Sequence, residues 1–445
     1  MKHIQKRFLL FAVAAVSTLM PAVAQSLEEQ KTDSLTTGSE EVQVAFRKVS
    51  QSDILGGVSV VNVEELTKKN YNTYSMDNMQ GYIGGWNGNS LWAMDEYLAL
   101  VDGVPRDLNN VKPDEIETIT FLKGAQAVVL YGSRAAKGAV LVTTKRGKIS
   151  PLTVEVRANT GWNVAKSYPE YLGSSEYMTL YNEALANDGL STKYSMEDIY
   201  NTGLGLNPYR YPNVNFYSSD YIKKAYNRSD VTAEISGGND RARFYSNVSY
   251  YNMGDMLNFG EAKNTGSDRF NVRGNVDLKL NDFITAYVNA NVSFYNSKAS
   301  AGGNYWQLAS TFRPNRVSPL IPLSYIDPNA TAAWDLIANS NNIIDGKYFF
   351  AGSQEDLTNV FADYYAAGKT KYTSRQFQFD AGVNIDLSSV LKGLSFHTQF
   401  AVDYATSYNT SYNNEYATYI PTWSNYNGQD VIVACLLYTS DAADE

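Results

Sequence analysis

The chain has 445 residues, a formal net charge of −9, 19% charged residues and 13% aromatic residues, among them 34 Tyr and 18 Phe. The negative balance argues against nucleic-acid binding, because phosphate recognition needs clustered Lys and Arg. A single cysteine, Cys435, excludes an internal disulfide framework and a cysteine-based metal site, and His397 is the only histidine after the leader. We therefore expect no metal, no cofactor and no histidine triad.

The first 24 residues have the pattern of a secretory signal peptide. Basic residues precede an apolar core that ends at Met20, and Ala22-Val23-Ala24 forms a cleavage site. We expect export with cleavage after Ala24. No later stretch reaches the ~18 consecutive apolar residues that a membrane-spanning helix needs. If the mature chain enters a membrane, it must do so as a β-barrel, whose strands satisfy each other's backbone groups.

The stretch from Tyr97 to Gly147 predicts a compact α+β unit of strands covered by short helices. Pro113 suits a helix start, because proline lacks only a donor that a first turn leaves unpaired. Ala125–Leu130 is expected to form a second helix that stops at Gly132. Three apolar, β-branched runs separated by turn residues predict strands at Tyr97–Val101, Ile116–Leu122 and Ala139–Thr144.

Four ordered blocks of this stretch closely resemble the plug domain of TonB-dependent outer-membrane transporters, in the SusC/RagA branch. They are Asp102-Gly103-Val104-Pro105, Ile116-Glu117-Thr118-Ile119, Leu122-Lys123-Gly124-Ala125 and Tyr131-Gly132-Ser133-Arg134-Ala135-Ala136-Lys137-Gly138. The resemblance implies an α+β plug domain followed by an antiparallel transmembrane β-barrel, located in the bacterial outer membrane. It also implies that the plug motif residues shape the gate, namely Asp102, Gly103, Lys123, Gly124, Tyr131, Gly132, Ser133, Arg134 and Gly138.

The same resemblance implies partners. In this family a short segment ahead of the plug pairs with TonB of the inner membrane as an added strand, with main-chain hydrogen bonds supplying the affinity. A plain first strand of the plug is the alternative for that segment. A SusD-like surface lipoprotein and outer-membrane lipid are further implied partners, and the implied cargo is a glycan oligosaccharide or a peptide. The candidate TonB contact is the alternating run Glu41, Val42, Gln43, Val44, Ala45 and Phe46.

The plug departs from the family pattern at three points. No separate β-sandwich domain precedes it, and Gln80–Trp86 matches the family's glycine-rich block only loosely. An Ile-Arg-Gly motif is absent between Trp86 and Tyr97. We therefore expect a plug that is shortened between these two residues.

From Leu152 onward the pattern changes to a strict alternation of apolar and polar residues. In the clearest stretches Phe270 and Val288 belong to the apolar face, which should meet lipid, and Asn275 and Asn289 to the polar face, which should meet the lumen. Long strands with one apolar and one hydrated face predict a transmembrane barrel, whereas soluble sandwiches usually have shorter strands. Seven such strands are expected, at Thr153–Asn163, Val231–Ser236, Arg241–Asn252, Arg269–Leu280, Thr285–Tyr295, Gln376–Leu387 and Ser395–Asp403.

The connections between these strands are of two kinds. Asn281-Asp282 is a tight turn of the periplasmic kind, whereas Ala165–Arg228 and Asn296–Lys371 are long enough to be outer loops of a barrel. Within the first long connection, Ser174–Asn187 predicts a helix with Glu176 in its first turn.

The division of the chain follows from these patterns. A plugged transporter barrel uses about 22 strands, and the residues after the plug cannot supply them, so we expect only the first strands of a barrel. Cys435–Glu445 breaks the alternation and suggests a foreign tail on a truncated gene fragment. The expected parts are a signal peptide (1–24), a flexible periplasmic segment (25–40), the TonB-contact strand with the plug (41–150), a partial barrel (151–434) and a suspected non-native tail (435–445).

Three functions are compatible with the sequence. The first is TonB-dependent import of a nutrient across the outer membrane, and the second is a passive porin or surface-binding barrel whose plug no longer moves. The third is a secreted carbohydrate-acting enzyme with paired carboxylates, for which no motif marks a pair. We expect import and no enzymatic activity.

Overall fold

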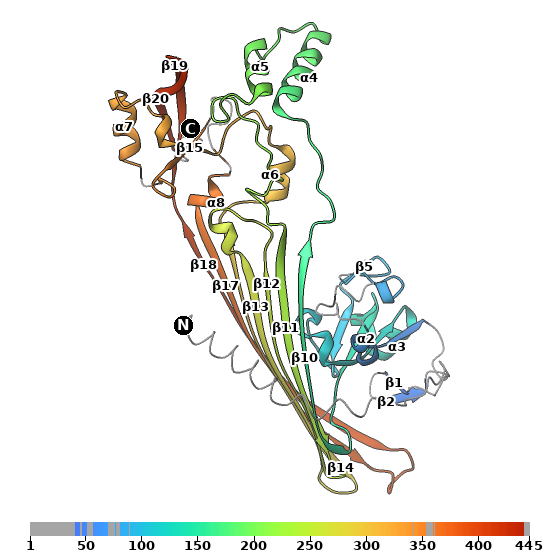
Figure 1. The fold of residues 1–445 in the computed structure, drawn as a ribbon. Coiled ribbons are helices and arrows are strands. Elements are labelled where there is room, and N and C mark those ends of the chain that lie inside the picture. Colours follow the sequence, from blue (N-terminus) through green and yellow to red (C-terminus); the bar gives the residue numbers. More distant parts are fainter. Residues whose placement is uncertain are drawn as a thin grey trace, which may run out of the picture.

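The computed structural model describes residues 41–44, 47–50, 57–69, 76, 81–88, 90–340, 342–352, 359 and 361–439. Three parts can be distinguished in Figure 1. We call the described residues of the range 57–148 the plug and the sheet that begins at Ser150 the wall. The cap comprises the described residues of the ranges 165–224, 255–265, 301–367 and 414–439. The plug stands beside the lower half of the wall, and the cap covers the wall's upper end (Figure 1).

The plug is built on a five-stranded sheet with the strand order β3-β8-β9-β6-β7. β6 and β9 are parallel, and the other neighbours are antiparallel. The strands are β3 (Val58–Asn62), β6 (Leu98–Val101), β7 (Val104–Pro105), β8 (Ile116–Leu122) and β9 (Ala139–Thr144). The helical elements are α2 (Val63–Lys69), η3 (Leu108–Asn110), η4 (Pro113–Glu115), α3 (Ala125–Tyr131) and η5 (Gly132–Ala135).

Most predictions for the plug are confirmed. The second and third predicted strands coincide with β8 and β9, and the first begins one residue late, at Leu98. The helix expected to start at Pro113 is a single 3-10 turn, because Ile116 already pairs with Thr144 as the first residue of β8. The stretch after Trp86 forms a small hairpin of β4 (Ser90–Leu91) and β5 (Met94–Asp95).

The wall is a sheet of seven antiparallel strands in sequence order. All seven strands predicted from alternation are confirmed, and each is longer than the alternating run that indicated it. In the part of the chain that the structure describes, β10 and β18 are the two edges, so the sheet is open. The strands are β10 (Ser150–Val164), β11 (Ala225–Gly238), β12 (Ala242–Gly254), β13 (Gly266–Lys279), β14 (Ile284–Ser300), β17 (Gly368–Asp386) and β18 (Ser395–Asn413).

In the wall the apolar face is exposed and the polar face is covered, which is the reverse of the arrangement in a soluble sheet. Phe270 and Val288 on the apolar face are 39% and 37% exposed, whereas Asn275 and Asn289 on the polar face are each 1% exposed beneath the plug. An exposed apolar face suits the acyl chains of a bilayer, and a covered polar face suits a lumen that holds a polar plug. The predicted assignment of these residues to opposite faces is confirmed.

This sidedness makes a prediction for thiol labelling in a Cys435→Ser background. Val288→Cys and Phe270→Cys should react slowly with a membrane-impermeant reagent, because lipid excludes it from that face. Ser297→Cys, on the polar face of β14 above the plug, should react at least tenfold faster. Asn289→Cys should react only after the plug has been deleted. Labelling of Val288→Cys as fast as Ser297→Cys would contradict the assignment of the faces.

The cap is formed by the long connections and by a final hairpin. The predicted helix at Ser174–Asn187 is confirmed as α4. No helix in the described ranges has the length and hydropathy to cross a membrane. The other elements are α5 (Met196–Leu204), η6 (Gly260–Asn264), α6 (Tyr305–Thr311), β15 (Leu320–Pro322), η7 (Leu323–Tyr325), α7 (Thr331–Ala338), β16 (Tyr348–Phe350), α8 (Asp363–Ala366), β19 (Ala417–Tyr426) and β20 (Gln429–Thr439).

The final hairpin extends into the segment that the sequence marks as a suspected non-native tail. Cys435 lies inside β20 opposite Pro421, and the pairing with β19 continues to Thr439 opposite Ala417. The side chain of Cys435 contacts an apolar cluster of the cap that includes Tyr419 and Ile432. Part of this strand packs against the apolar cluster of the cap rather than in the sheet of the wall. The non-native origin of residues 435–445 stays a prediction.

Candidate functional site: the contact between plug and wall

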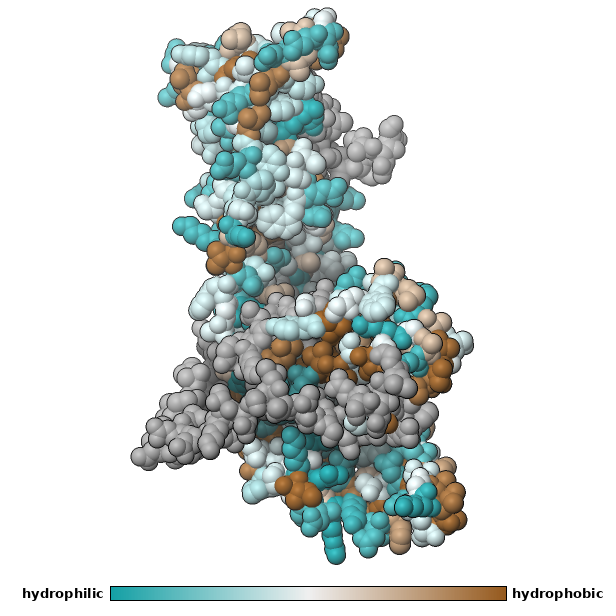
Figure 2. All heavy atoms as spheres, turned by 90° about the vertical axis from the view of Figure 1, so that its right-hand side faces the viewer, coloured by the Kyte–Doolittle hydropathy of each residue, from teal (hydrophilic) through white to brown (hydrophobic). Residues whose placement is uncertain are grey.

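The plug touches the wall through charged and amide side chains rather than through its apolar core. The plug contributes residues from two regions, the segment from Asp102 to Glu115 and the segment from Thr144 to Arg146. The wall contributes side chains of β10 to β14, β17 and β18. Figure 2 shows the molecule from the side on which the plug stands.

Arg106 joins the plug to two strands of the wall at once. It follows β7, and its Nη1 lies 2.7 Å from Oδ1 of Asp380 on β17. Its Nε and Nη2 hold Asp403 on β18 at 2.9 and 2.7 Å. Asn289 of β14 donates to the other oxygen of Asp380 at 2.5 Å. Arg106 is 7% and Asp380 1% exposed, so the guanidinium neutralises a carboxylate that water barely reaches.

Glu115 forms a second buried ion pair with the wall. It ends the η4 turn and is fully buried. Its Oε2 accepts a hydrogen bond from Nε of Arg273 at 2.8 Å, and its Oε1 accepts one from the amide of Asn271; both residues lie on β13. Lys112 of the same segment donates to Ser249 of β12 at 2.9 Å. The η4 turn therefore places one anion and one cation against two neighbouring strands.

The exit of β9 supplies a third group of contacts. Lys145 pairs with Glu234 of β11 at 2.7 Å, and Arg146 pairs with Asp277 of β13 at 2.7 Å. The guanidinium of Arg146 also lies over the ring of Tyr287, 5.2 Å from its centroid. Asn275 donates to the backbone carbonyl of Lys145 at 2.7 Å. These contacts fix the direction in which the chain leaves the plug for β10.

Burial shifts the pKa of two plug residues in this contact. The pKa of the Asp114 carboxyl is raised by desolvation, against the stabilising influence of its hydrogen bond from Thr232 and of nearby Arg157. The pKa of the Lys112 amine is lowered by desolvation, although Glu115 opposes that shift. Both pKa shifts have the direction that desolvation produces, because removal from water disfavours the charged form of a group. Burying these charged groups in the docked plug therefore costs free energy. Their hydrogen bonds and their oppositely charged neighbours offset this cost.

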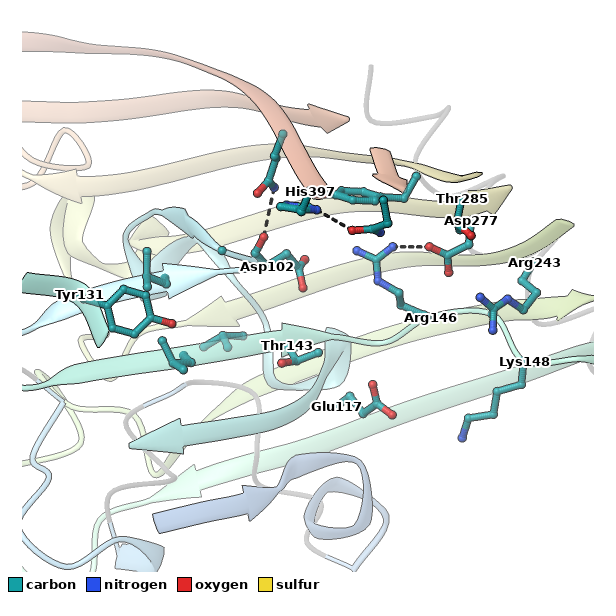
Figure 3. A pocket seen from close by; sticks show the side chains of 18 residues that line it. Asp102, Glu117, Tyr131, Thr143, Arg146, Lys148, Arg243, Asp277, Thr285 and His397 are labelled. Atoms are coloured by element: carbon teal, nitrogen blue, oxygen red, sulfur yellow. Dashed lines mark hydrogen bonds and ion pairs between the residues drawn. The ribbon is translucent and has the colours of Figure 1, made fainter. Parts of the chain in front are cut away.

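A cavity of about 810 Å³ lies beneath the contact, between the plug and the lower ends of the wall strands (Figure 3). Asp102 and Tyr131 line it from the plug, and Tyr287 and His397 from the wall. Figure 3 shows Arg146 pointing toward Asp277. The side-chain amide of Gln399 donates to the backbone carbonyl of Asp102 at 3.1 Å. Within the described residues, no group of three or more His, Cys, Asp or Glu side chains could hold a metal ion.

The predicted plug motif residues fall into two sets. Asp102 and Gly103 form the turn after β6, where the Asp102 carboxylate accepts hydrogen bonds from the backbone and hydroxyl of Thr144 at 3.0 and 2.7 Å. These two residues and Tyr131 line the cavity. Gly124, Gly132 and Gly138 have φ of 63°, 68° and 101°, values that a side chain disfavours, so they shape the turns around α3 and η5. Ser133 and Arg134 lie in η5, and Lys123 lies over the ring of Trp92.

The predicted TonB contact lies apart from this site. Glu41–Val44 forms strand β1, which pairs with β2 (Arg47–Ser50) as an antiparallel hairpin. Among the described strands, β1 has no partner on its other edge. Ala45 and Phe46 lie outside the described residues. The assignment of this segment to TonB stays a prediction.

Sequence reasoning missed the residues that hold the plug to the wall, above all Arg106, Glu115 and Lys145. Period-two alternation assigned their partners to the polar face, yet alternation carries no information about which plug residue meets which strand. A usable signal was present: Glu115 and Lys145 flank β8 and β9, and charged residues directly beside buried strands are seldom left unpaired.

Comparison with known proteins supports this architecture. Residues 28–139 match the family model of the TonB-dependent Receptor Plug Domain. TonB-dependent receptor P26 of Formosa agariphila is 27% identical over 285 residues, which cover 58% of this chain and 27% of the relative. TonB-dependent receptor SusC of Bacteroides thetaiotaomicron is 28% identical over 173 residues, which cover 32% of this chain and 17% of SusC. The chain therefore carries the plug domain of TonB-dependent receptors over residues 28–139 and is similar in sequence to SusC.

The solved structures agree with the fold of this chain. The RagAB peptide importer in its open-open state superposes with a TM-score of 0.59 at 19% identity, covering 85% of this chain and 43% of that chain. TonB-dependent receptors are outer-membrane proteins and are not a class of enzymes. The matched part of this chain spans less than a third of the length of the curated relatives, at 27% for P26 and 30% for P39.

Proposed function

We propose that the complete receptor imports a nutrient across the bacterial outer membrane, with TonB as the source of energy. The observation that carries this proposal is the plug, which is docked on the polar face of the wall by ion pairs and hydrogen bonds. A polar contact of this kind can separate and re-form in water, as a gate must. In this proposal Met1–Ala24 directs export and is removed after Ala24.

Two partners belong to the proposal. A SusD-like surface lipoprotein captures the cargo at the cap, which the resemblance to SusC supports. TonB pairs with Glu41–Phe46 from the periplasmic side. The cargo is a glycan oligosaccharide or a peptide. A solved relative in fold is described as a peptide importer, which keeps the second possibility open.

The register of the β1–β2 hairpin shows which residue to replace in a test of TonB coupling. Backbone donors of successive residues in an antiparallel strand alternate between the partner and the open edge. Val44 lies next to the turn opposite Arg47, so it is expected to donate within the hairpin, and Gln43 to the open edge. Gln43→Pro should therefore abolish uptake of labelled substrate in cells by removing a donor that TonB needs.

Gln43→Ala is the matched control, since it keeps the backbone donor, and it should transport like the parent. Outer-membrane abundance of both variants is measured by immunoblotting. If Gln43→Pro took up substrate as fast as the parent, this segment would not be the strand that pairs with TonB. Parental uptake after deletion of TonB would replace the import proposal with a passive porin.

A further inference from the structure

Four cations gather on the apolar face of the wall, at its upper end. Lys298 of β14 shares a strand face with Val288, because an even number of positions separates them. Lys371 of β17 lies directly opposite Lys298 in the register of the sheet. Lys369 and Arg375 stand on the same face of β17, at even spacing from Lys371. All four side chains are exposed, and we call these four residues the basic cluster.

The basic cluster begins where the apolar band of the wall ends. On β14 every side chain of this face from Ile284 to Phe294 is apolar. Such a run spans about 34 Å along a strand, or about 25 Å in height for a strand tilted by roughly 40°. The apolar band of an outer-membrane barrel has the same height. Arg375 lies opposite Phe294, the last residue of the run, so the cluster stands at the level of lipid headgroups.

The protein does not neutralise the charges of the basic cluster. Among the residues that the structure describes, none of the four side chains forms an ion pair with a carboxylate. Asp268, on the same face of β13, accepts a hydrogen bond from Asn296 at 2.8 Å instead. Like charges directly opposite each other in a sheet repel, which applies to Lys298 and Lys371. An anion between these two ammonium groups would remove the repulsion.

The surroundings of Arg375 suit an amphiphile. Its guanidinium carbon lies 5.9 Å from the ring centroid of Tyr408, and its Nη2 lies 3.5 Å from the hydroxyl of that residue. A guanidinium presents paired donors that match a phosphate group. Below it, Phe377 and Tyr404 lie opposite each other and are 41% and 63% exposed. A ligand with phosphate groups above acyl chains would meet cations and apolar rings in the same order.

The basic cluster lies on the outer side of the membrane. The long connections that form the cap leave the upper end of the wall, whereas Asn281-Asp282 closes a tight turn at the lower end (Figure 1). Outer-membrane barrels place short turns in the periplasm and long loops outside the cell. The lipid at this height therefore belongs to the outer leaflet. Lipopolysaccharide of that leaflet carries phosphate groups on lipid A, directly above its acyl chains.

We propose that the basic cluster binds the phosphate groups of an outer-leaflet lipid, with Lys298 and Lys371 on either side of one phosphate and Arg375 donating to the same headgroup. The acyl chains lie against Phe377 and Tyr404. The bound lipid joins β14 to β17 at the height where two like charges would otherwise repel. This assignment rests on the outer-membrane location of the protein and not on import.

Native mass spectrometry of the full-length protein in a neutral detergent tests the proposal. The probes are lipid A and the same lipid A after enzymatic removal of its phosphate groups. The parent should bind the phosphorylated form at least about tenfold more tightly. Lys298→Gln combined with Lys371→Gln should weaken that binding about tenfold or more, because each cation beside an anionic membrane surface contributes roughly a fivefold factor.

Two controls accompany this double variant. Lys298→Arg combined with Lys371→Arg keeps both charges and should bind the phosphorylated form within about threefold of the parent. Lys392→Gln removes an exposed lysine from the short link between β17 and β18 at the lower end of the wall, and should leave the affinity unchanged. Far-UV circular dichroism shows whether each variant keeps its sheet.

Three results would overturn the proposal. The first is equal affinity of the parent for the two forms of lipid A, and the second is parental affinity in the double glutamine variant. The third is complete displacement of lipid A by inorganic phosphate at equal concentration, which would make the cluster a plain anion site. Binding needs neither TonB nor cargo, so failure here together with TonB-dependent uptake would refute the lipid site alone. Phosphate-dependent lipid binding together with uptake that ignores TonB would refute active import alone.

Discussion

Replacing Arg106 with alanine is expected to release the plug from β17 and β18. The substitution leaves Asp380, which is 1% exposed, and Asp403 without the cation that holds both. Removing one partner of a buried ion pair costs about 3–5 kcal/mol. That loss corresponds to an increase of roughly a hundredfold to a few thousandfold in the population of the undocked plug. Ion conductance of the full-length receptor in planar bilayers should rise accordingly.

Two further variants distinguish release of the plug from a nonspecific loss of structure. Lys137→Ala breaks an exposed pair with Glu96, in which both side chains are about half or more in water, and should leave conductance unchanged. Arg106→Ala combined with Asp380→Asn and Asp403→Asn removes the uncompensated charges and should restore most of the closed state. Parental conductance in Arg106→Ala alone would show that these ion pairs do not hold the plug.

Replacing Glu115 with glutamine is expected to have an effect of similar size at β13. Arg273, 2% exposed, would then keep its charge with no anion beside it. We again expect a loss of about 3–5 kcal/mol in docking free energy. Hydrogen exchange of the β8 and β9 amides, followed by mass spectrometry, should accelerate by about two orders of magnitude or more.

A double-mutant cycle tests the assignment of this effect to the pair. Combining Glu115→Met with Arg273→Met removes both charges and should slow exchange again relative to either single variant. Glu117→Gln, two residues further along β8 at the edge of the cavity, is the matched control and should exchange like the parent. Equal exchange rates in Glu115→Gln and the parent would mean that the pair contributes nothing to docking.

The sequence was sufficient for the strands of the wall and for their faces. Alternation is a local property, and a side chain two residues away always returns to the same face. The positions of β8, β9 and α3 also followed from local signals, namely β-branched runs and the glycines that end them. Gly132 and Gly138 have positive φ, which is why those residues recur in the motif that indicated the family.

The docking residues could not be derived in the same way. Arg106 and Asp403 are 297 positions apart in the sequence, and nothing local relates them. The faces of the wall were predictable, yet the height at which the plug sits along each strand depends on three-dimensional fit.

The polar character of the contact between plug and wall has a consequence for how the plug leaves. Separation of two apolar surfaces carries a large positive heat-capacity change, and the freed surfaces then tend to aggregate. Here the groups that separate are carboxylates, guanidinium groups and amides, and exposed polar surface lowers the heat capacity. The plug can therefore come away as a folded body with a wettable surface. Its release should respond to ionic strength and to pulling force far more than to temperature.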